Sequence, residues 1–285
     1  MKICRFENAQ GRARVGLLLA DSSVLDLSAE GIDRLSSLLE FDGLMLQLTA
    51  LAGQNLPRFD LGEVRLLAPV EQQEVWAAGV TYLRSKKARM EESNFSATAY
   101  DQVYEAPRPE LFFKSLPDKV VAPGDAVGIR QDARWNVPEP ELALVINSRG
   151  HVAGYTIGND MSSRDIEGEN LLYLPQAKIY NRSCALGPCV AVGTGEAEAR
   201  AWKIGLRILR GRQTAFEGET SAAQIKRGFA ELVSYLFRSQ TFPHGAVLLT
   251  GTGIVPPDGF TLQAGDTIQI DVSGIGRLEN KVIEV

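Results

Sequence analysis

The chain has 285 residues, of which 45% are hydrophobic and 23% are charged; this is the composition of a globular protein and excludes a disordered chain. The net charge is -5, so no general attraction to phosphate backbones is expected, and nucleic acid is not a predicted partner. The three cysteines form no secreted disulfide pattern, and the first residues lack the apolar core of a signal peptide or a membrane span. The sequence therefore predicts a cytoplasmic protein without a membrane partner.

The first 68 residues are predicted to form a small α+β domain. Short apolar strands are expected at residues 2–6, 15–19 and 24–27. A helical stretch follows, in which leucines recur at roughly helical spacing: Leu35, Leu38, Leu39, Leu46 and Leu48. The chain then passes through Pro69 into a new apolar strand, so the boundary is placed there, between domains of residues 1–68 and 69–285.

The second domain is predicted to be mostly β-structure. The polar residues 81–101 suit a solvated helix or lid at the edge of a cleft. Short strands are expected at residues 111–113, 120–121, 141–146, 152–158, 189–193, 202–209, 246–249 and 267–272. One helix is predicted at residues 221–238, where an apolar face is formed by Ile225, Phe229, Leu232, Val233 and Leu236. Because strands and helices do not alternate regularly, the pattern argues against a TIM barrel and a doubly wound sheet.

Acidic residues suggest a metal site. Glu139 and Glu141 are two residues apart at the start of a predicted strand, so both carboxylates point to the same face. Close carboxylates repel each other unless a cation lies between them; the alternative is an exposed strand edge, where Pro140 would be tolerated. Asp160 follows the next strand and could complete the set, or could be a helix N-cap or Asx-turn residue. Three oxygen ligands would favour Mg²⁺ or Mn²⁺ over Zn²⁺.

Longer segments resemble the fumarylacetoacetate hydrolase family. They are PEPELALVI, GYTIGNDMSSRD, LGPCV, LLTGTGIV and GDTIQIDVSGIGRLENKV, in consistent order over roughly the last three quarters of the chain. The resemblance implies an α+β, mostly β fold, with a β-roll body and a small N-terminal α+β domain, assembled as a homodimer or higher homo-oligomer. It implies a divalent metal on Glu139, Glu141 and Asp160. It also implies substrate or transition-state contacts at Arg164, Lys178 and Thr252.

The predicted lid departs from the family members that hydrolyse carbon–carbon bonds. Those members carry Asn-Tyr-x-x-His-x-x-Glu, in which a His-Glu dyad activates water. Here Thr81 stands at the Asn position and Ser85 at the His position. His151 and His244 lie outside the lid and are interpreted as structural or surface residues. The general base for water is therefore missing.

Three segments resemble instead the 2-keto-3-deoxy-D-arabinonate dehydratase branch of the family. They are GVTYLRSKKARMEES, YDQVYEAPRPELFFK and ENLLYLPQAKIY. This branch implies catalytic roles for Lys178 and Glu110 and a substrate contact at Thr81, and Lys114, in a Phe-x-Lys pattern, is predicted as a further substrate-binding residue. From the residues alone, Glu110 could instead form a surface salt bridge with Arg108, and Lys178 could be a solvated loop lysine.

The predicted function is that of a metal-dependent dehydratase, which is a lyase. Its expected substrate is a 2-keto-3-deoxy sugar acid, with a pentonate as the first candidate, and its products are 2,5-dioxopentanoate and water. The 2-oxo acid would chelate Mg²⁺ or Mn²⁺. Lys178 is the expected base and Glu110 the expected acid, with the reverse assignment left open, and Arg164 would hold the carboxylate end or the metal ligands. Two alternatives stay open. One is a metal-dependent hydrolase or decarboxylase of a β-dicarbonyl acid such as an acylpyruvate, and the other is a noncatalytic protein that binds 2-oxo acids or has a structural role.

Overall fold

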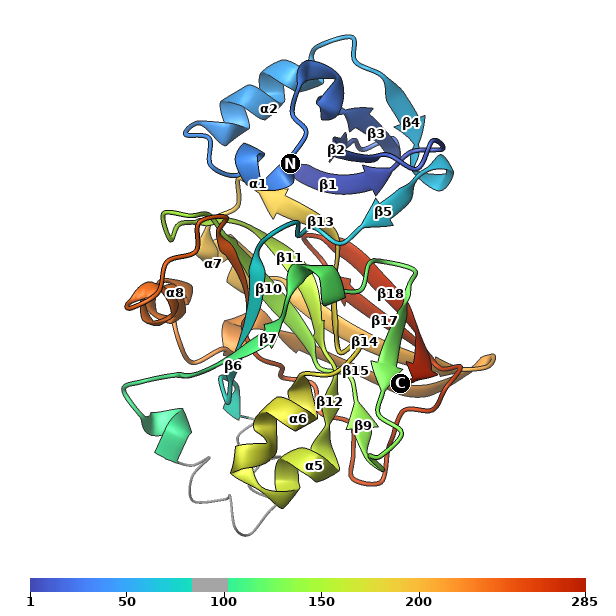
Figure 1. Ribbon diagram of the computed structural model, residues 1–285, viewed down its shortest axis with the longest axis vertical. Coiled ribbons are helices and arrows are strands. Elements are labelled where there is room, and N and C mark those ends of the chain that lie inside the picture. Colours follow the sequence, from blue (N-terminus) through green and yellow to red (C-terminus); the bar gives the residue numbers. More distant parts are fainter. Residues whose placement is uncertain (84–101) are drawn as a thin grey trace.

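The computed structural model describes residues 1–83 and 102–285 and is mostly β-structure. The N-terminal residues form a cap at one end, and the short helices α5 and α6 lie at the opposite end (Figure 1). Within the described residues, the strands form one sheet of eleven, one of five and one of two. The predicted lid falls largely on residues 84–101, including Ser85, and so lies outside the described residues. No described helix is long and apolar enough to cross a membrane.

The N-terminal part combines five strands and two α-helices. The strands are β1 (Lys2–Glu7), β2 (Ala13–Leu18), β3 (Ser23–Asp26), β4 (Arg58–Asp60) and β5 (Arg65–Leu67), and the helices are α1 (Leu35–Leu38) and α2 (Leu44–Ala52). The predicted helical stretch is therefore broken in two, and Gly43, at φ 78°, takes the left-handed conformation that separates them. Leu48 is buried as expected, but Leu46 is 79% exposed because the break rotates it away from the core.

The largest sheet runs from the N-terminal part into the body. Its order is β4-β3-β2-β1-β13-β11-β10-β16-β6-β7, with β5 paired to β1. The body strands are β6 (Glu74–Gly79), β7 (Glu110–Ser115), β10 (Pro140–Ile146), β11 (Val152–Asp160), β13 (Cys184–Val192) and β16 (Ala246–Leu249). Every residue of β10 and of β16 is buried, which explains the continuous apolar sequences of β16 and of residues 142–146 in β10. The division into domains at residue 68 stays a prediction.

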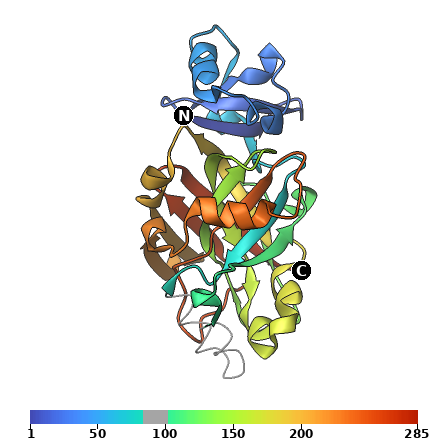
Figure 2. The ribbon, with the colours of Figure 1, turned by 90° about the vertical axis from the view of Figure 1, so that its left-hand side faces the viewer.

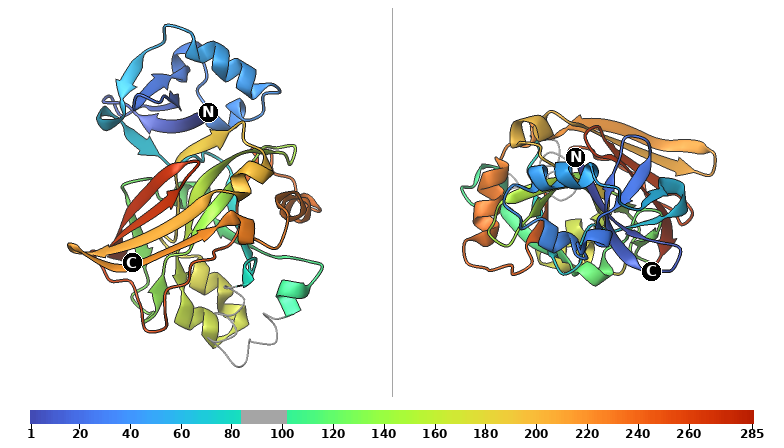
Figure 3. Two further views of the ribbon diagram at one scale, coloured as in Figure 1. Left: turned by 180° about the vertical axis from the view of Figure 1, so that it is seen from behind. Right: turned by 90° about the horizontal axis from the view of Figure 1, so that it is seen from above.

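The second sheet has the order β15-β14-β17-β18-β8 and packs against the first. Its strands are β8 (Ala126–Ile129), β14 (Lys203–Arg210), β15 (Gln213–Ser221), β17 (Thr267–Val272) and β18 (Gly276–Glu284). Seen from behind, these strands lie across the body (Figure 3). Alternate residues of β14 and β17 enter the same apolar core as alternate residues of β10, namely Ile204, Leu206, Ile208, Ile268, Ile270, Leu142, Leu144 and Ile146.

The remaining elements are short. The two-stranded sheet pairs β9 (Asn136–Val137) with β12 (Ser162–Ser163), and the helices are α5 (Arg164–Glu169), α6 (Leu174–Lys178), α7 (Glu196–Arg200) and α8 (Phe229–Phe237). Helix α8 lies across the strands of the body (Figure 2) and buries Phe229, Leu232, Val233 and Leu236 in the core, as its apolar face predicts. Residues 120–121 form no strand; Val121 makes only an isolated bridge to Ala185.

The helix predicted at residues 221–238 is α-helical over its second half only, and its first half contains a short 3-10 helix, Ala222–Gln224. Ser221 ends β15, and α8 begins after Gly228. Between them, Ile225 is extended, with φ -68° and ψ 123°, and forms a β-bridge to Tyr82. Because this bridge buries Ile225 in the core without a helix, the tertiary pairing overrides the helical spacing. It also ties the segment that carries Thr81 to the body, since the Lys226 N–H donates to the Thr81 carbonyl at 3.0 Å.

Candidate active site

Several strand ends meet at one edge of the large sheet. Strand β10 runs antiparallel to both β11 and β16, while β16 runs parallel to β6. The beginnings of β7 and β10 therefore lie at the same edge as the ends of β6, β11 and β16. This edge faces away from the cap, because β13 pairs with β1 at its other end, through Val190 and Ala191. Residues far apart in the sequence are thus brought to one place.

Three carboxylates converge at this edge. Glu139 and Glu141 flank Pro140 at the start of β10, and Asp160 ends β11. The Asp160 N–H donates to the Glu139 carbonyl at 3.0 Å, so these residues lie opposite each other and share a face. One ligand oxygen from each of the three lies within 4.8 Å of the others, and none of the residues is more than 3% exposed. The alternative of an exposed strand edge is therefore wrong.

The electrostatics of this cluster fit a divalent cation. Burial raises the pKa of Glu141 well above its usual range, and the carboxylates of Asp160 and Glu139 raise it further. Lys178 and the Gly251 N–H, which donates to Glu141 at 2.5 Å, oppose the rise in this pKa. Three buried carboxylates that repel one another form the kind of site that Mg²⁺ or Mn²⁺ occupies. The remaining coordination positions of the cation are left for water or substrate.

Lys178 lies against the carboxylates. It ends α6 and is 1% exposed, so it is not a solvated loop lysine. Its ammonium donates to Glu139 at 2.6 Å, to Asp160 at 3.1 Å and to the Ser162 hydroxyl at 2.6 Å. The same nitrogen lies 5.7 Å from the centre of the Phe112 ring. All three ammonium protons are therefore directed to acceptors within the site.

Two further buried cations surround the cluster. Arg164 begins α5 and donates to Glu139 at 2.7 Å. Lys114, on β7, lies 2.5 Å from a carboxylate oxygen of Asp160 and donates to the carbonyl of Met161 at 3.0 Å and to the carbonyl of Lys178. Lys114 is 0% exposed. It is therefore enclosed by protein on all sides in this structure.

A small cavity opens in front of the carboxylates. Its lining includes the three carboxylates and Lys178, the predicted residues Glu110 and Thr252, and in addition Gly79, Phe112, Glu167 and Gly251. Thr81 lies beside this lining, and its hydroxyl donates to the carbonyl of Thr250 at 2.6 Å. Glu110 therefore faces the cavity, whereas Arg108 lies over the Tyr235 ring, 5.4 Å from its centre. His151 and His244 are exposed.

Sequence reasoning missed Glu167. This glutamate lies on α5, three residues after Arg164, and is 1% exposed although it lines the cavity. Residues three apart on a helix lie on the same face, so the spacing from Arg164 could have placed its carboxylate at the site. The cavity therefore contains two carboxylates, those of Glu167 and Glu110, besides the three of the candidate metal site.

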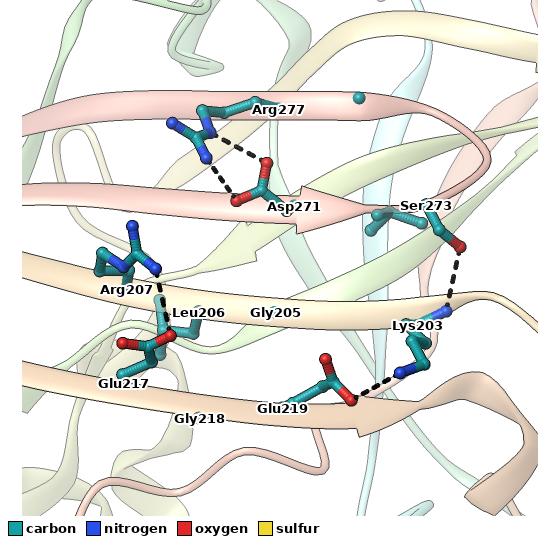
Figure 4. A pocket seen from close by; sticks show the side chains of 12 residues that line it. Lys203, Gly205, Leu206, Arg207, Glu217, Gly218, Glu219, Asp271, Ser273 and Arg277 are labelled. Carbon is teal, nitrogen blue, oxygen red and sulfur yellow. Dashed lines mark hydrogen bonds and ion pairs between the residues drawn. The ribbon is translucent and has the colours of Figure 1, made fainter.

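A wider pocket lies on the outer face of the five-stranded sheet (Figure 4). Its six charged side chains pair with one another: Arg207 with Glu217 at 3.2 Å, Lys203 with Glu219 at 3.3 Å, and Arg277 with Asp271 at 2.9 Å. Each pair is at least partly exposed and therefore weak. Because these charges compensate one another, this pocket lacks the concentrated charge of the carboxylate cluster, which is the candidate active site.

Comparison with known proteins places the chain in a family. The family model described as fumarylacetoacetate (FAA) hydrolase C-terminal matches residues 74–283. The chain belongs to the fumarylacetoacetate hydrolase family. This confirms the resemblance seen in the sequence, and the matched residues contain every residue of the candidate site.

Within the fumarylacetoacetate hydrolase family, similar relatives are dehydratases by name. A "Probable 2-keto-3-deoxyxylonate dehydratase" of Haloferax volcanii is 49% identical over 217 residues, which cover 76% of this chain and 74% of the relative. The 2-dehydro-3-deoxy-D-arabinonate dehydratase of Saccharolobus solfataricus is 39% identical over 226 residues, which cover 78% of this chain and 76% of the relative.

Solved structures agree with the predicted fold. A 2-keto-3-deoxy-D-arabinonate dehydratase complexed with magnesium and 2,5-dioxopentanoate superimposes with a TM-score of 0.84 at 32% identity, over 100% of this chain and 99% of that one. The apo form gives a TM-score of 0.85 at 33% identity, with the same coverage. The prediction of a mostly β, fumarylacetoacetate hydrolase-like fold is therefore confirmed.

Proposed function

We propose that this protein is a magnesium-dependent hydro-lyase that converts a 2-keto-3-deoxypentonate to 2,5-dioxopentanoate and water. The observation that carries the proposal is the cavity itself, in which three buried carboxylates and Lys178 face Glu110. The names of the similar relatives, and the magnesium and 2,5-dioxopentanoate in the related structure, support this choice of reaction.

Glu139, Glu141 and Asp160 would hold the Mg²⁺, because they are the buried oxygen donors that converge. When bound, the cation supplies a positive charge that favours the enolate form of a 2-oxo acid. The protein prepares this site in advance. Arg164 and Lys178 each donate to one oxygen of Glu139, and Lys114 holds Asp160, so the carboxylates are fixed before any ligand arrives.

Lys178 and Glu110 would supply the base and the acid of the elimination. The base removes a proton from C3, and the acid gives a proton to the C4 hydroxyl, which leaves as water with the electrons of its bond to C4. The electrons of the broken C3–H bond form the C3=C4 double bond. Transfer of a proton from C5 to C3 then moves the double bond to C4=C5. The resulting enol takes a proton at C4 and loses the proton of its C5 hydroxyl, so that C5 becomes an aldehyde and 2,5-dioxopentanoate is complete.

The polar residues around the cavity would orient the substrate. Thr252 lines the cavity and would bind a substrate hydroxyl, and Thr81 is placed beside it through its bond to Thr250. The predicted direct substrate contacts of Arg164 and Lys114 stay predictions. The contacts of Lys114 with Asp160 and Lys178 support a positioning role for its ammonium. We further propose a homodimer or higher homo-oligomer, as the family resemblance implies, and a cytoplasmic location, which the sequence predicts from its few cysteines and its N-terminal residues.

The test offers three substrates to the purified protein with Mg²⁺: 2-keto-3-deoxy-D-arabinonate, 2-keto-3-deoxy-D-xylonate and an acylpyruvate. Mass spectrometry is expected to show 2,5-dioxopentanoate from at least one pentonate and none in the Glu141→Gln control. Turnover of the acylpyruvate without any dioxopentanoate would favour the hydrolase alternative and overturn the proposal. In D₂O, the Lys178→Met and Glu110→Gln variants assign the two roles, because the variant without the base loses hydrogen exchange at C3, whereas the variant without the acid retains it.

A further inference from the structure

We propose that Gly79 is a positioning residue for Glu110: the absence of a side chain at position 79 leaves the space through which the Glu110 carboxylate reaches the cavity. The inference rests on the proposed function, because it concerns a group to which that function gives a proton-transfer role. The geometry comes from the pairing of β6 with β7 and from the position of the Glu110 side chain.

Gly79 and Glu110 are direct cross-strand partners. Strand β6 ends at Gly79, β7 begins at Glu110, and the antiparallel register pairs these two residues. Side chains of directly opposed residues leave the sheet on the same side. A Cβ atom built on Gly79 would lie 2.0 Å from Oε2, 2.6 Å from Cδ and 3.3 Å from Cγ of Glu110. The Glu110 side chain therefore occupies the space above the Gly79 backbone, and both residues line the cavity.

Backbone conformation does not explain this glycine. Gly79 has an ordinary φ, in contrast to Gly251, which has φ +93°. An alanine could therefore adopt the Gly79 backbone, and the cost of replacing it would come from the contact with Glu110. A glycine inside or at the end of a strand often marks a close approach of another group, and here that group is a carboxylate.

Strand β7 carries two other contacts of the site. Alternation along the strand places Glu110 and Phe112 on one side, and Lys114 follows at a β-bulge, between Phe113 and Ser115, where the register with β6 shifts. The Phe112 ring lies beneath the Lys178 ammonium, and Lys114 binds Asp160. Glu110 is the member of this row at the start of the strand and is half-buried. The Glu110 side chain reaches into the cavity because residue 79 has no side chain to fill the space above its backbone. A side chain at position 79 would fill this space and force the Glu110 side chain to turn away.

The first experiment compares Gly79→Ala with wild type under saturating Mg²⁺. We expect kcat to fall by about 10–100-fold, because a displacement on the order of 1 Å of a catalytic group has effects of this size. We expect KM and the Mg²⁺-induced rise in the unfolding midpoint to change less than about 2-fold, since the carboxylates that hold the cation are untouched. Gly205→Ala is the matched control: the nearest heavy atom to its Cβ is 4.0 Å away, so its kcat should equal that of wild type.

The second experiment separates this inference from the proposed function. Urea unfolding midpoints are measured for Gly79→Ala, Glu110→Ala and the double variant. If Gly79 acts through Glu110, Gly79→Ala lowers the midpoint in the presence of the Glu110 side chain and leaves it unchanged once that side chain is removed. Equal shifts in both backgrounds, or full kcat in Gly79→Ala, overturn the inference. A wild-type protein without dehydratase activity overturns the proposed function, while the midpoints still decide whether Gly79 positions Glu110.

Discussion

Two candidate ligands of the same cation are expected to affect the metal-free protein in opposite ways. Glu139 accepts from two buried cations, Arg164 at 2.7 Å and Lys178 at 2.6 Å. Glu139→Gln leaves both cations facing an amide. Glu141 accepts the Gly251 N–H, which an amide oxygen can still accept, and its other close neighbours include two carboxylates that raise its pKa. Glu141→Gln therefore removes a repulsion without leaving a cation unpaired.

The expected difference can be estimated from the burial of these pairs. Removing one member of a buried ion pair costs about 3–5 kcal/mol, because the other charge stays buried. The side chains of Glu139, Arg164 and Lys178 are at most 4% exposed, so this range applies. With a urea m-value of about 3 kcal/mol/M, Glu139→Gln should lower the unfolding midpoint by roughly 1 M or more. The midpoint of Glu141→Gln should equal or exceed that of wild type.

The assay is urea unfolding followed by circular dichroism, first in EDTA and then with Mg²⁺. A cation present at about 100 times its Kd stabilises the wild-type protein by about 2.7 kcal/mol. Both variants should lose most of this increment, since each removes a ligand oxygen. If Glu139→Gln and Glu141→Gln have the same unfolding midpoint in EDTA, the reasoning is refuted. Glu139 would then not be stabilised by its cations more than Glu141 is, and Glu141 would not be destabilised by its neighbouring carboxylates.

Three further outcomes are expected. Lys178→Met should lower kcat by about 10²–10⁴-fold but keep or increase the Mg²⁺-induced stabilisation, because the cation replaces the lost ammonium; loss of Mg²⁺ binding would contradict this. Glu110→Gln should lower kcat over the same range of about 10²–10⁴-fold, and a titration of stability with Mg²⁺ should match wild type, whereas a weaker response would place Glu110 among the metal ligands. Burial raises the pKa of Cys184 and of Cys189 to about 12, and raises that of Cys4 too, so the thiols stay protonated at pH 8. Native protein should resist iodoacetamide, and mass spectrometry should find labelling only after denaturation.

The sequence predicted the parts of the site that depend on local periodicity. Alternation along β10 placed Glu139 and Glu141 on one face, and the end of the next strand placed Asp160 beside them. Two strands with a clear apolar pattern, the continuous buried run of β16 and the alternating residues of β17, were located with the correct limits at residues 246–249 and 267–272. These features follow from short-range rules, because the pleat and the antiparallel pairing of neighbouring strands fix them.

Features that depend on distant contacts were not predicted. Ile225 has helical spacing but pairs with Tyr82 instead, and no local signal announces that bridge. Strand β15 was missed because most of its residues face solvent and its apolar pattern is weak. The partners of Lys114 lie 46 to 64 residues along the chain, so the sequence could not show that its ammonium is enclosed. Such contacts are visible only once the sheet is assembled.

The pairing of β1 with β13 has a consequence for any attempt to shorten this protein. Lys2 and Ile3 hydrogen-bond to the margin of the body's sheet, opposite Ala191 and Val190, and the terminal amine donates to the Val192 carbonyl at 3.0 Å. Deleting residues 1–68 would uncover the peptide groups of β13 at that margin. An exposed edge strand with unpaired peptide groups can pair with strands of other molecules. The trimmed body is therefore expected to aggregate, so the cap protects the body from non-native strand pairing at this position.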